Sequence, residues 1–161
     1  ARRVRHTQIM MMADELLHRG GTELTELAQS ELTGQILGAA FEVHTVLGPG
    51  LLESVYQQAL GRELQLQGLP FSSQVHVPLQ YKGGTLDTSL RLDLLVAEQV
   101  IVEIKSIAAL EDIHHAQLLT YLRLTGMQVG LLINFNVVSL KLGIKRVINT
   151  PRTSANSVPP R

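Results

Sequence analysis

Three charged side chains interrupt the most apolar stretch of this sequence. The segment RLDLLVAEQVIVEIKS at residues 91–106 is rich in leucine, valine and isoleucine, as core strands are, yet it carries Asp93, Glu103 and Lys105. Burying a carboxylate or an ammonium group without a partner costs several kcal/mol, a large part of the net stability of an ordinary domain. The folded chain must therefore either pair these charges with partners or use them in its function.

The spacing of the three charges predicts that they lie together. Residues two apart in a strand share a face, so Glu103 and Lys105 project to the same side. A tight connection at residues 97–99 would bring Asp93 beside Glu103 from a neighbouring antiparallel strand. Two adjacent carboxylates repel unless a cation lies between them, and oxygen ligands favour Mg²⁺ or Mn²⁺. An exposed Glu–Lys salt bridge with a solvated aspartate is the alternative interpretation.

Composition limits the class of protein. A chain of 161 residues is long enough for one domain with its own core, and 45% hydrophobic residues with 17% charged residues is typical of a globular protein. The sequence has no cysteine, which excludes disulfides and thiolate metal sites and is typical of a reducing compartment. Because we find neither an apolar run of roughly 18 residues nor a secretory pattern, we expect a cytoplasmic protein without membrane contact.

The charges are distributed unevenly along the chain. The formal net charge is zero, but all 14 acidic residues lie between Asp14 and Asp112, so that both ends of the chain are basic. Basic ends suit contact with a phosphate backbone, and an acidic centre suits a bound metal ion. Solvated charged tails are the simpler interpretation of the same pattern.

Hydrophobic periodicity predicts an α+β or mixed α/β domain around one central sheet. Apolar residues at helical spacing predict three helices, at about residues 30–47, 52–67 and 110–124. Alternating and apolar runs predict five strands, at about residues 75–81, 86–96, 100–105, 127–135 and 142–148. We expect the first three strands to form an antiparallel meander.

The two ends of the chain are poorly patterned. Residues 1–29 are expected to form a peripheral N-terminal extension. The Pro- and Ser-rich residues 150–161 have little to bury and are expected to be a disordered C-terminal tail. The predicted domain therefore covers residues 30–149.

The ordered motifs resemble a known group of proteins. Asp93 followed by Glu103-x-Lys105 resembles the signature of the PD-(D/E)xK phosphodiesterase superfamily. Five segments within residues 30–148 also resemble, in order, the GxxExxY family of that superfamily, namely GLLESVY, RLDLLV, VIVEIKSI, HHAQLLTYL and VGLLINF. The resemblance implies a restriction-endonuclease-like αβββαβ core, with a central mixed sheet flanked by helices. Leu92 stands where the superfamily motif has its proline, a departure that many members share.

The resemblance also implies roles for individual residues. Asp93 and Glu103 would bind the metal ion, with the backbone carbonyl of Ile104 as a further ligand. Lys105 would orient the attacking water and stabilise negative charge on the phosphate. Glu53, on the second helix, would complete or brace the metal site.

Residues of the third predicted helix would support this centre. Gln117 and Tyr121 lie one helical turn apart and match the Gln-x-x-x-Tyr pattern of the exonuclease branch. His114 shares their helical face and is expected to line a substrate groove. For His44 we favour a packed or hydrogen-bonded role over an approach to the metal ion.

The sequence thus predicts a Mg²⁺- or Mn²⁺-dependent nuclease that hydrolyses the backbone of DNA or RNA, with DNA favoured, by an ion-activated water. One alternative is a non-catalytic nucleic-acid or protein-binding module that retains the fold, which the neutral net charge keeps open. Another is an enzyme that hydrolyses a smaller phosphodiester. An aromatic content of 4% argues against a stacking platform for single strands. A homodimer is a reasonable expectation for the assembly.

Overall fold

The computed structural model describes residues 26–150. The predicted features at residues 1–25 and 151–161 lie outside these described residues, so the predicted limits of the domain stay a prediction. The chain divides between Gly38 and Ala39 into two compact units. In the first unit, residues 26–38 are helical, and the Thr33 hydroxyl donates a hydrogen bond to the backbone carbonyl of Gln29.

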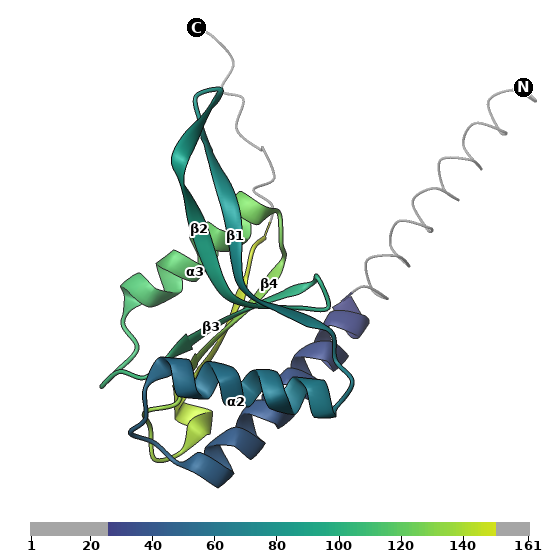
Figure 1. Cartoon of the computed structure of the whole chain (residues 1–161), viewed down its shortest axis with the longest axis vertical. Coiled ribbons are helices and arrows are strands. Elements are labelled where there is room, and N and C mark those ends of the chain that lie inside the picture. The colour runs from purple at the N-terminus through teal and green to yellow at the C-terminus, as the bar shows by residue number, and fades with distance from the viewer. Residues whose placement is uncertain (1–25, 151–161) are drawn as a thin grey trace, which may run out of the picture. The chain divides into compact units, whose positions relative to one another are not determined.

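The second unit holds all the predicted site residues. It begins with helical residues 39–47 and continues in the order of helix, three strands, helix and two strands, which confirms the predicted order (Figure 1). Its elements are α2 (Glu53–Leu66), β1 (Phe71–Tyr81), β2 (Gly84–Val96), β3 (Val100–Lys105), α3 (Asp112–Thr125), β4 (Val129–Asn134), the 3₁₀ turn η1 (Leu140–Gly143) and β5 (Ile144–Ile148). The strand β1 begins earlier than its alternating pattern predicts.

The five strands form one mixed sheet in the order β1-β2-β3-β4-β5. Only β3 and β4 pair in parallel, whereas β1 with β2, β2 with β3, and β4 with β5 are antiparallel. The connection between the parallel strands is long enough to hold α3, as a parallel crossover requires. The meander and the central mixed sheet are therefore confirmed, and the arrangement is consistent with the expected restriction-endonuclease-like core.

The helix α3 covers one face of the sheet. Its buried residues Leu118 and Leu122 pack in one apolar cluster with Ile101 of β3 and Leu132 of β4. A Cβ atom at Gly130 would lie 2.9 Å from the Leu118 side chain, so this glycine allows the helix to approach the sheet closely. The site residues of α3 are thereby held against the sheet.

The helix α2 contacts β1 and β3. It lies on a different side of the sheet from α3 (Figure 1). Tyr56 anchors the beginning of this helix, because its ring stacks on Phe135 with centroids 4.6 Å apart and its hydroxyl donates to the backbone carbonyl of Gly48. Gly48 has φ 69° and ends the preceding helix, as the Gly-Pro-Gly sequence predicts. The start of α2 is thus fixed relative to the sheet.

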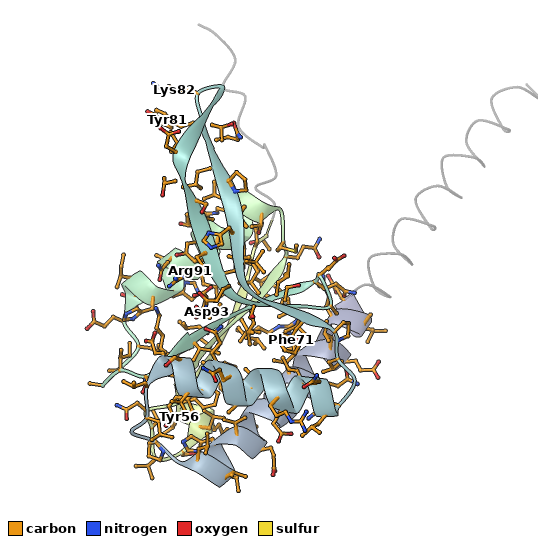
Figure 2. All side chains as sticks on the ribbon, viewed as in Figure 1. Tyr56, Phe71, Tyr81, Lys82, Arg91 and Asp93 are labelled. Atoms are coloured by element: carbon orange, nitrogen blue, oxygen red, sulfur yellow. The ribbon has the colours of Figure 1, made fainter. Side chains whose placement is uncertain are left out.

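The strands β1 and β2 continue beyond the sheet as a two-stranded hairpin. The strand β2 pairs with β3 only through residues 94–96, whereas it pairs with β1 along most of its length. Figure 2 shows Tyr81 and Lys82 at the tip of this hairpin and Asp93 near its base. The turn has φ 48° at Lys82 and 82° at Gly83, as a tight hairpin turn of the favoured hand requires. Asp93 therefore lies where the hairpin leaves the sheet.

The helix α3 begins with a cap that involves His114. The ring Nδ1 of His114 accepts a hydrogen bond of 2.9 Å from the backbone N–H of Glu111, the residue before the helix. This contact gives His114 a capping role, and its expected place in a substrate groove stays a prediction. Among the described helices, none combines the length and the hydropathy that crossing a membrane requires.

Candidate active site

The two carboxylates of the charged segment meet where β2 and β3 separate. The last paired residues are Leu94 and Val102, and the next position of this register places Asp93 opposite Glu103. At this position the backbone-to-backbone hydrogen bonds between β2 and β3 stop, and carboxylate side chains accept hydrogen bonds from the backbone instead. Glu103 Oε1 accepts from the Asp93 N–H at 3.3 Å, and Asp93 Oδ2 accepts from the Ile104 N–H at 2.9 Å. The charges thus satisfy backbone donors that the parting strands leave unpaired.

The backbone carbonyl of Ile104 points into the same gap. The backbone N–H of Phe135 donates to the Lys105 carbonyl at 2.9 Å, so the polar groups of Lys105 face the β4 side. Backbone directions alternate along a strand, and the Ile104 N–H already points at Asp93. The Ile104 carbonyl consequently faces the β2 side, from which Asp93 approaches, and its role as a metal ligand stays a prediction.

Burial makes the carboxylate pair electrostatically unfavourable. Glu103 is only 6% exposed. Desolvation, followed by the nearby negative charge of Asp93, raises the pKa of Glu103 to about 8, although Lys105 acts in the opposite direction. At neutral pH the pair therefore tends to hold a proton, and a bound cation would compensate the second charge.

The donor set fits a magnesium-like ion. Asp93 and Glu103 bring carboxylate oxygens together here, close enough for a hydrogen bond between the two side chains, and the Ile104 carbonyl is the further predicted ligand. No group of three or more His, Asp or Glu side chains within residues 26–150 is placed to hold a metal ion. Mg²⁺ commonly binds through one or two carboxylates and keeps several waters, whereas an all-protein cage would need more side chains.

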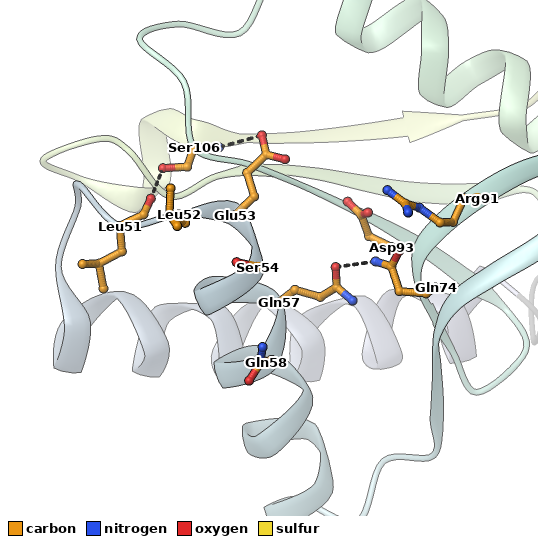
Figure 3. Close-up of a pocket in the computed structure, with 10 residues that line it drawn as sticks. All are labelled: Leu51, Leu52, Glu53, Ser54, Gln57, Gln58, Gln74, Arg91, Asp93 and Ser106. Atoms are coloured by element: carbon orange, nitrogen blue, oxygen red, sulfur yellow. Dashed lines mark hydrogen bonds between the residues drawn. The ribbon is translucent and has the colours of Figure 1, made fainter.

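Glu53 connects the start of α2 to the end of β3. It is the first residue of the helix, and its carboxylate accepts a hydrogen bond of 3.3 Å from the backbone N–H of Ser106. The Ser106 hydroxyl in turn donates to the Leu51 carbonyl at 2.5 Å (Figure 3). Glu53 thus reaches the segment directly after Lys105, and its role as a metal ligand or brace stays a prediction.

Tyr121 approaches the carboxylates from α3. Burial, followed by the negative charges of Glu103 and Asp93, raises the pKa of the Tyr121 phenol. Gln117 donates a hydrogen bond of 2.8 Å to the Tyr121 hydroxyl, as their one-turn spacing predicts. The phenol therefore lies within electrostatic reach of the two acids, and Gln117 fixes the position of its hydroxyl.

An open cavity of about 700 Å³ is lined by Asp93 of the carboxylate pair and by Glu53, whereas Glu103 and Lys105 are not among its lining residues. The start of α2 forms one wall, and the base of the hairpin forms the other (Figure 3). The polar residues that line it include Glu53, Gln57, Gln74, Arg91, Asp93 and Ser106. Gln74 Nε2 donates to Gln57 Oε1 at 2.6 Å and so joins the two walls.

Four of these six cavity residues were not predicted, namely Gln57, Gln74, Arg91 and Ser106. Arg91 lies two residues before Asp93. Because residues two apart in a strand share a face, this spacing is the feature of the sequence that could have indicated it. Ser106 follows the predicted lysine directly and carries no signal of its own. Gln74 adopts φ 53° within β1, a conformation that the sequence does not indicate because glutamine rarely adopts it.

Asn134 is the last residue of β4. Its side chain is 1% exposed, accepts from the Ile107 N–H at 3.1 Å and donates to the Ile107 carbonyl at 3.0 Å. It therefore fixes the loop that follows Lys105. His44 Nε2 lies 2.7 Å from the Val137 carbonyl oxygen, which confirms the hydrogen-bonded role that we favoured for this residue.

Comparison with known proteins gives one match. The family model described as the PD-(D/E)XK nuclease superfamily matches residues 30–147, well over half of the chain. No curated protein and no solved structure matches the chain.

Proposed function

Because the chain belongs to the PD-(D/E)XK nuclease superfamily, we propose that it is a metal-dependent phosphodiesterase that hydrolyses the backbone of DNA or RNA. The observation that supports this most directly is the opposed pair Asp93 and Glu103, with Lys105 close to Glu103 and an open cavity on the Asp93 side. Two buried acids that need a cation, next to one amine, suit chemistry on an anionic phosphate.

The proposed roles follow the geometry of the side chains. Asp93, Glu103 and the Ile104 carbonyl would hold Mg²⁺ or Mn²⁺, which would neutralise phosphate charge and lower the pKa of bound water. Lys105 would orient the attacking water and add a positive charge near the phosphate. Glu53 would brace this centre from the start of α2 through its hydrogen bond to Ser106, and the GLLESVY segment there supports the proposed assignment to the GxxExxY family.

Gln117 and Tyr121 would position the reacting groups from the α3 side. The hydrogen bond between them orients the phenol, and the raised pKa of Tyr121 keeps it a donor at neutral pH. A neutral phenol close to Glu103 can donate to a carboxylate oxygen or to a water without adding negative charge. We therefore assign both residues to positioning rather than to proton transfer.

A cleavage assay tests the proposed function. Labelled single-stranded, duplex and branched DNA and RNA would be incubated with the protein in Mg²⁺, in Mn²⁺ and in EDTA. We expect cleavage only with metal ion, and a loss of about 100-fold or more in Asp93→Ala and Lys105→Ala. Lys145→Ala, which changes an exposed lysine on β5 at the other side of the sheet, is the matched control.

The outcomes separate the candidate functions. Equal digestion by the wild-type protein and by folded Lys105→Ala would rule out the proposed catalytic role. Binding of nucleic acid without any cleavage would indicate the non-catalytic module instead. Cleavage of a small phosphodiester but not of DNA or RNA would indicate an enzyme that acts on smaller phosphodiesters. The expected homodimer and cytoplasmic location stay predictions, which sedimentation and cell imaging would test.

A further inference from the structure

We infer that the cavity beside the carboxylates binds the phosphate of a nucleotide adjacent to the cleaved bond, and that Arg91 is its phosphate-binding residue. This inference rests on the proposed function, because it assigns a substrate contact at the same site. It adds a residue and a subsite that neither the signature motif nor the family match identifies.

The position of Arg91 is the first argument. Arg91 precedes Asp93 by two residues on β2, so both side chains leave the strand on the same side. Both line the same cavity, and Figure 3 shows the Arg91 guanidinium beside the Asp93 carboxylate. Leu92 between them is buried in the apolar cluster under α3. The register of β2 thus directs this arginine toward the proposed reaction centre.

The balance of charge in the cavity is the second argument. The residues that line it include two acids, Glu53 and Asp93, and one cation, Arg91. A phosphate entering beside a free carboxylate is repelled unless a positive group offsets the acid. The guanidinium keeps its charge at any working pH, and its planar donors match two phosphate oxygens at once. A surface pairing with Asp93 alone would contribute little to stability.

The shape and chemistry of the cavity are the third argument. Its volume of about 700 Å³ lies within the range of pockets that take small ligands. The lining contains no aromatic side chain on which a base would stack. The bridge between Gln57 and Gln74 leaves their other amide groups available for hydrogen bonds to a sugar or phosphate. The cavity therefore suits the backbone of a nucleic acid better than a base.

The inference is tested by binding, so that it does not depend on cleavage. In a Lys105→Ala background, affinity for labelled single-stranded and duplex DNA oligonucleotides would be measured over a range of salt concentrations with Arg91, Arg91→Gln and Arg91→Lys. We expect Arg91→Gln to weaken binding about tenfold or more, because it removes a charge-assisted contact. The slope of log affinity against log salt should fall by about 0.7 to 0.9, as for one lost phosphate contact.

Two controls make the result specific. Arg146→Gln removes an exposed arginine from β5, which two strands separate from β2, the strand of Arg91, and it should leave both affinity and salt slope unchanged. Arg91→Lys should recover part of the affinity, since lysine keeps the positive charge but cannot form the bidentate hydrogen bonds of a guanidinium group. Mn²⁺ affinity should not fall in Arg91→Gln, because the guanidinium is not a proposed metal ligand and its positive charge lies beside Asp93.

Several outcomes would overturn the inference. They are unchanged affinity in Arg91→Gln, an equal loss in Arg146→Gln, and the absence of any nucleic-acid binding by the wild-type protein. If binding depends on Arg91 but the wild-type protein cleaves nothing, the phosphate subsite stands and the proposed hydrolysis fails. The two proposals are therefore distinguishable.

Discussion

Asp93 and Glu103 each accept a hydrogen bond from a backbone N–H group on the opposite strand, at the position where β2 and β3 separate. Each carboxylate therefore closes the end of a sheet ladder as well as facing the other acid. The hydrogen bonds satisfy the backbone, but they do not remove the repulsion between two acids in a buried place. This unrelieved repulsion is the physical basis for expecting a cation at the site.

The raised pKa of Glu103 predicts how stability depends on pH in the absence of metal ion. The folded protein keeps a proton on Glu103 up to about pH 8, whereas an ordinary glutamate releases it near 4.5. Between these values the folded state binds more protons than the unfolded state, so stability should fall as the pH rises and level off above about 8. Urea unfolding in EDTA at a series of pH values would measure this slope.

Glu103→Gln is the control for this pH dependence. The amide has a similar shape and no charge, so the variant should lose the slope assigned to Glu103 and be more stable than the wild type at pH 8. Adding Mn²⁺ at pH 8 should stabilise the wild-type protein and not this variant. A wild-type protein with the same pH profile as Glu103→Gln would contradict the prediction.

The elements of the fold could be predicted because their patterns are local. The change of apolar spacing near Gly68 separates helix from strand, and Gly126, with φ 71°, ends α3 where the sequence predicts. The strand β3 has the predicted limits, Val100 and Lys105. The early start of β1 at Phe71 could not be predicted, because its polar residues are ordered by pairing with β2 and not by an alternating pattern of their own.

The candidate site could be predicted only in part. Asp93, Glu103 and Lys105 are recognisable because burying a charge in an apolar strand costs free energy. A charged residue within an apolar run of the sequence therefore indicates a partner or a function. Gln74 and Asn134 are not recognisable, since their importance lies in contacts with Gln57 and Ile107 that only the folded chain creates. Polar residues that act through tertiary hydrogen bonds leave no periodic signal.

Tyr121→Phe tests the positioning role of the phenol. The variant removes one hydroxyl that accepts from Gln117 and lies near the acids, and it leaves the ring in place. We expect cleavage to fall about tenfold, as for the loss of one hydrogen bond to a charged group. Mn²⁺ affinity should not change, because the phenol is not a proposed ligand. Gln117→Leu should show a smaller loss, and full activity in Tyr121→Phe would contradict the role.

Asn134→Ala tests the buried support of the site. The change removes the side-chain acceptor of the Ile107 N–H and the shorter of two side-chain hydrogen bonds to the Ile107 carbonyl, which should lower the free energy of unfolding by about 1 to 3 kcal/mol. Asn136→Ala is the control, because Asn136 is less buried and donates a longer bond of 3.3 Å to the same carbonyl. Urea unfolding measures both variants. A smaller loss in Asn134→Ala than in Asn136→Ala would contradict the assigned support.

Gln74 has an unfavourable backbone conformation, and its side chain donates a hydrogen bond across the cavity to Gln57. Substitutions can separate these two effects. Its φ of 53° is left-handed, which costs a residue with a side chain about 1 kcal/mol or more relative to glycine. Gln74→Gly loses the hydrogen bond to Gln57 but relieves this strain, whereas Gln74→Ala loses the bond and keeps the strain. We therefore expect the glycine variant to be the more stable of the two, the reverse of the usual order inside a strand.

The activities of the two variants should not follow their stabilities. Both lack the side chain that ties the base of the hairpin to α2, so both should bind nucleic acid and cleave it less well than the wild-type protein, to a similar degree. Urea unfolding measures the order of stability, and the cleavage assay measures the activities. An alanine variant at least as stable as the glycine variant would refute the backbone strain. A glycine variant with wild-type activity would show that the bridge has no part in shaping the site.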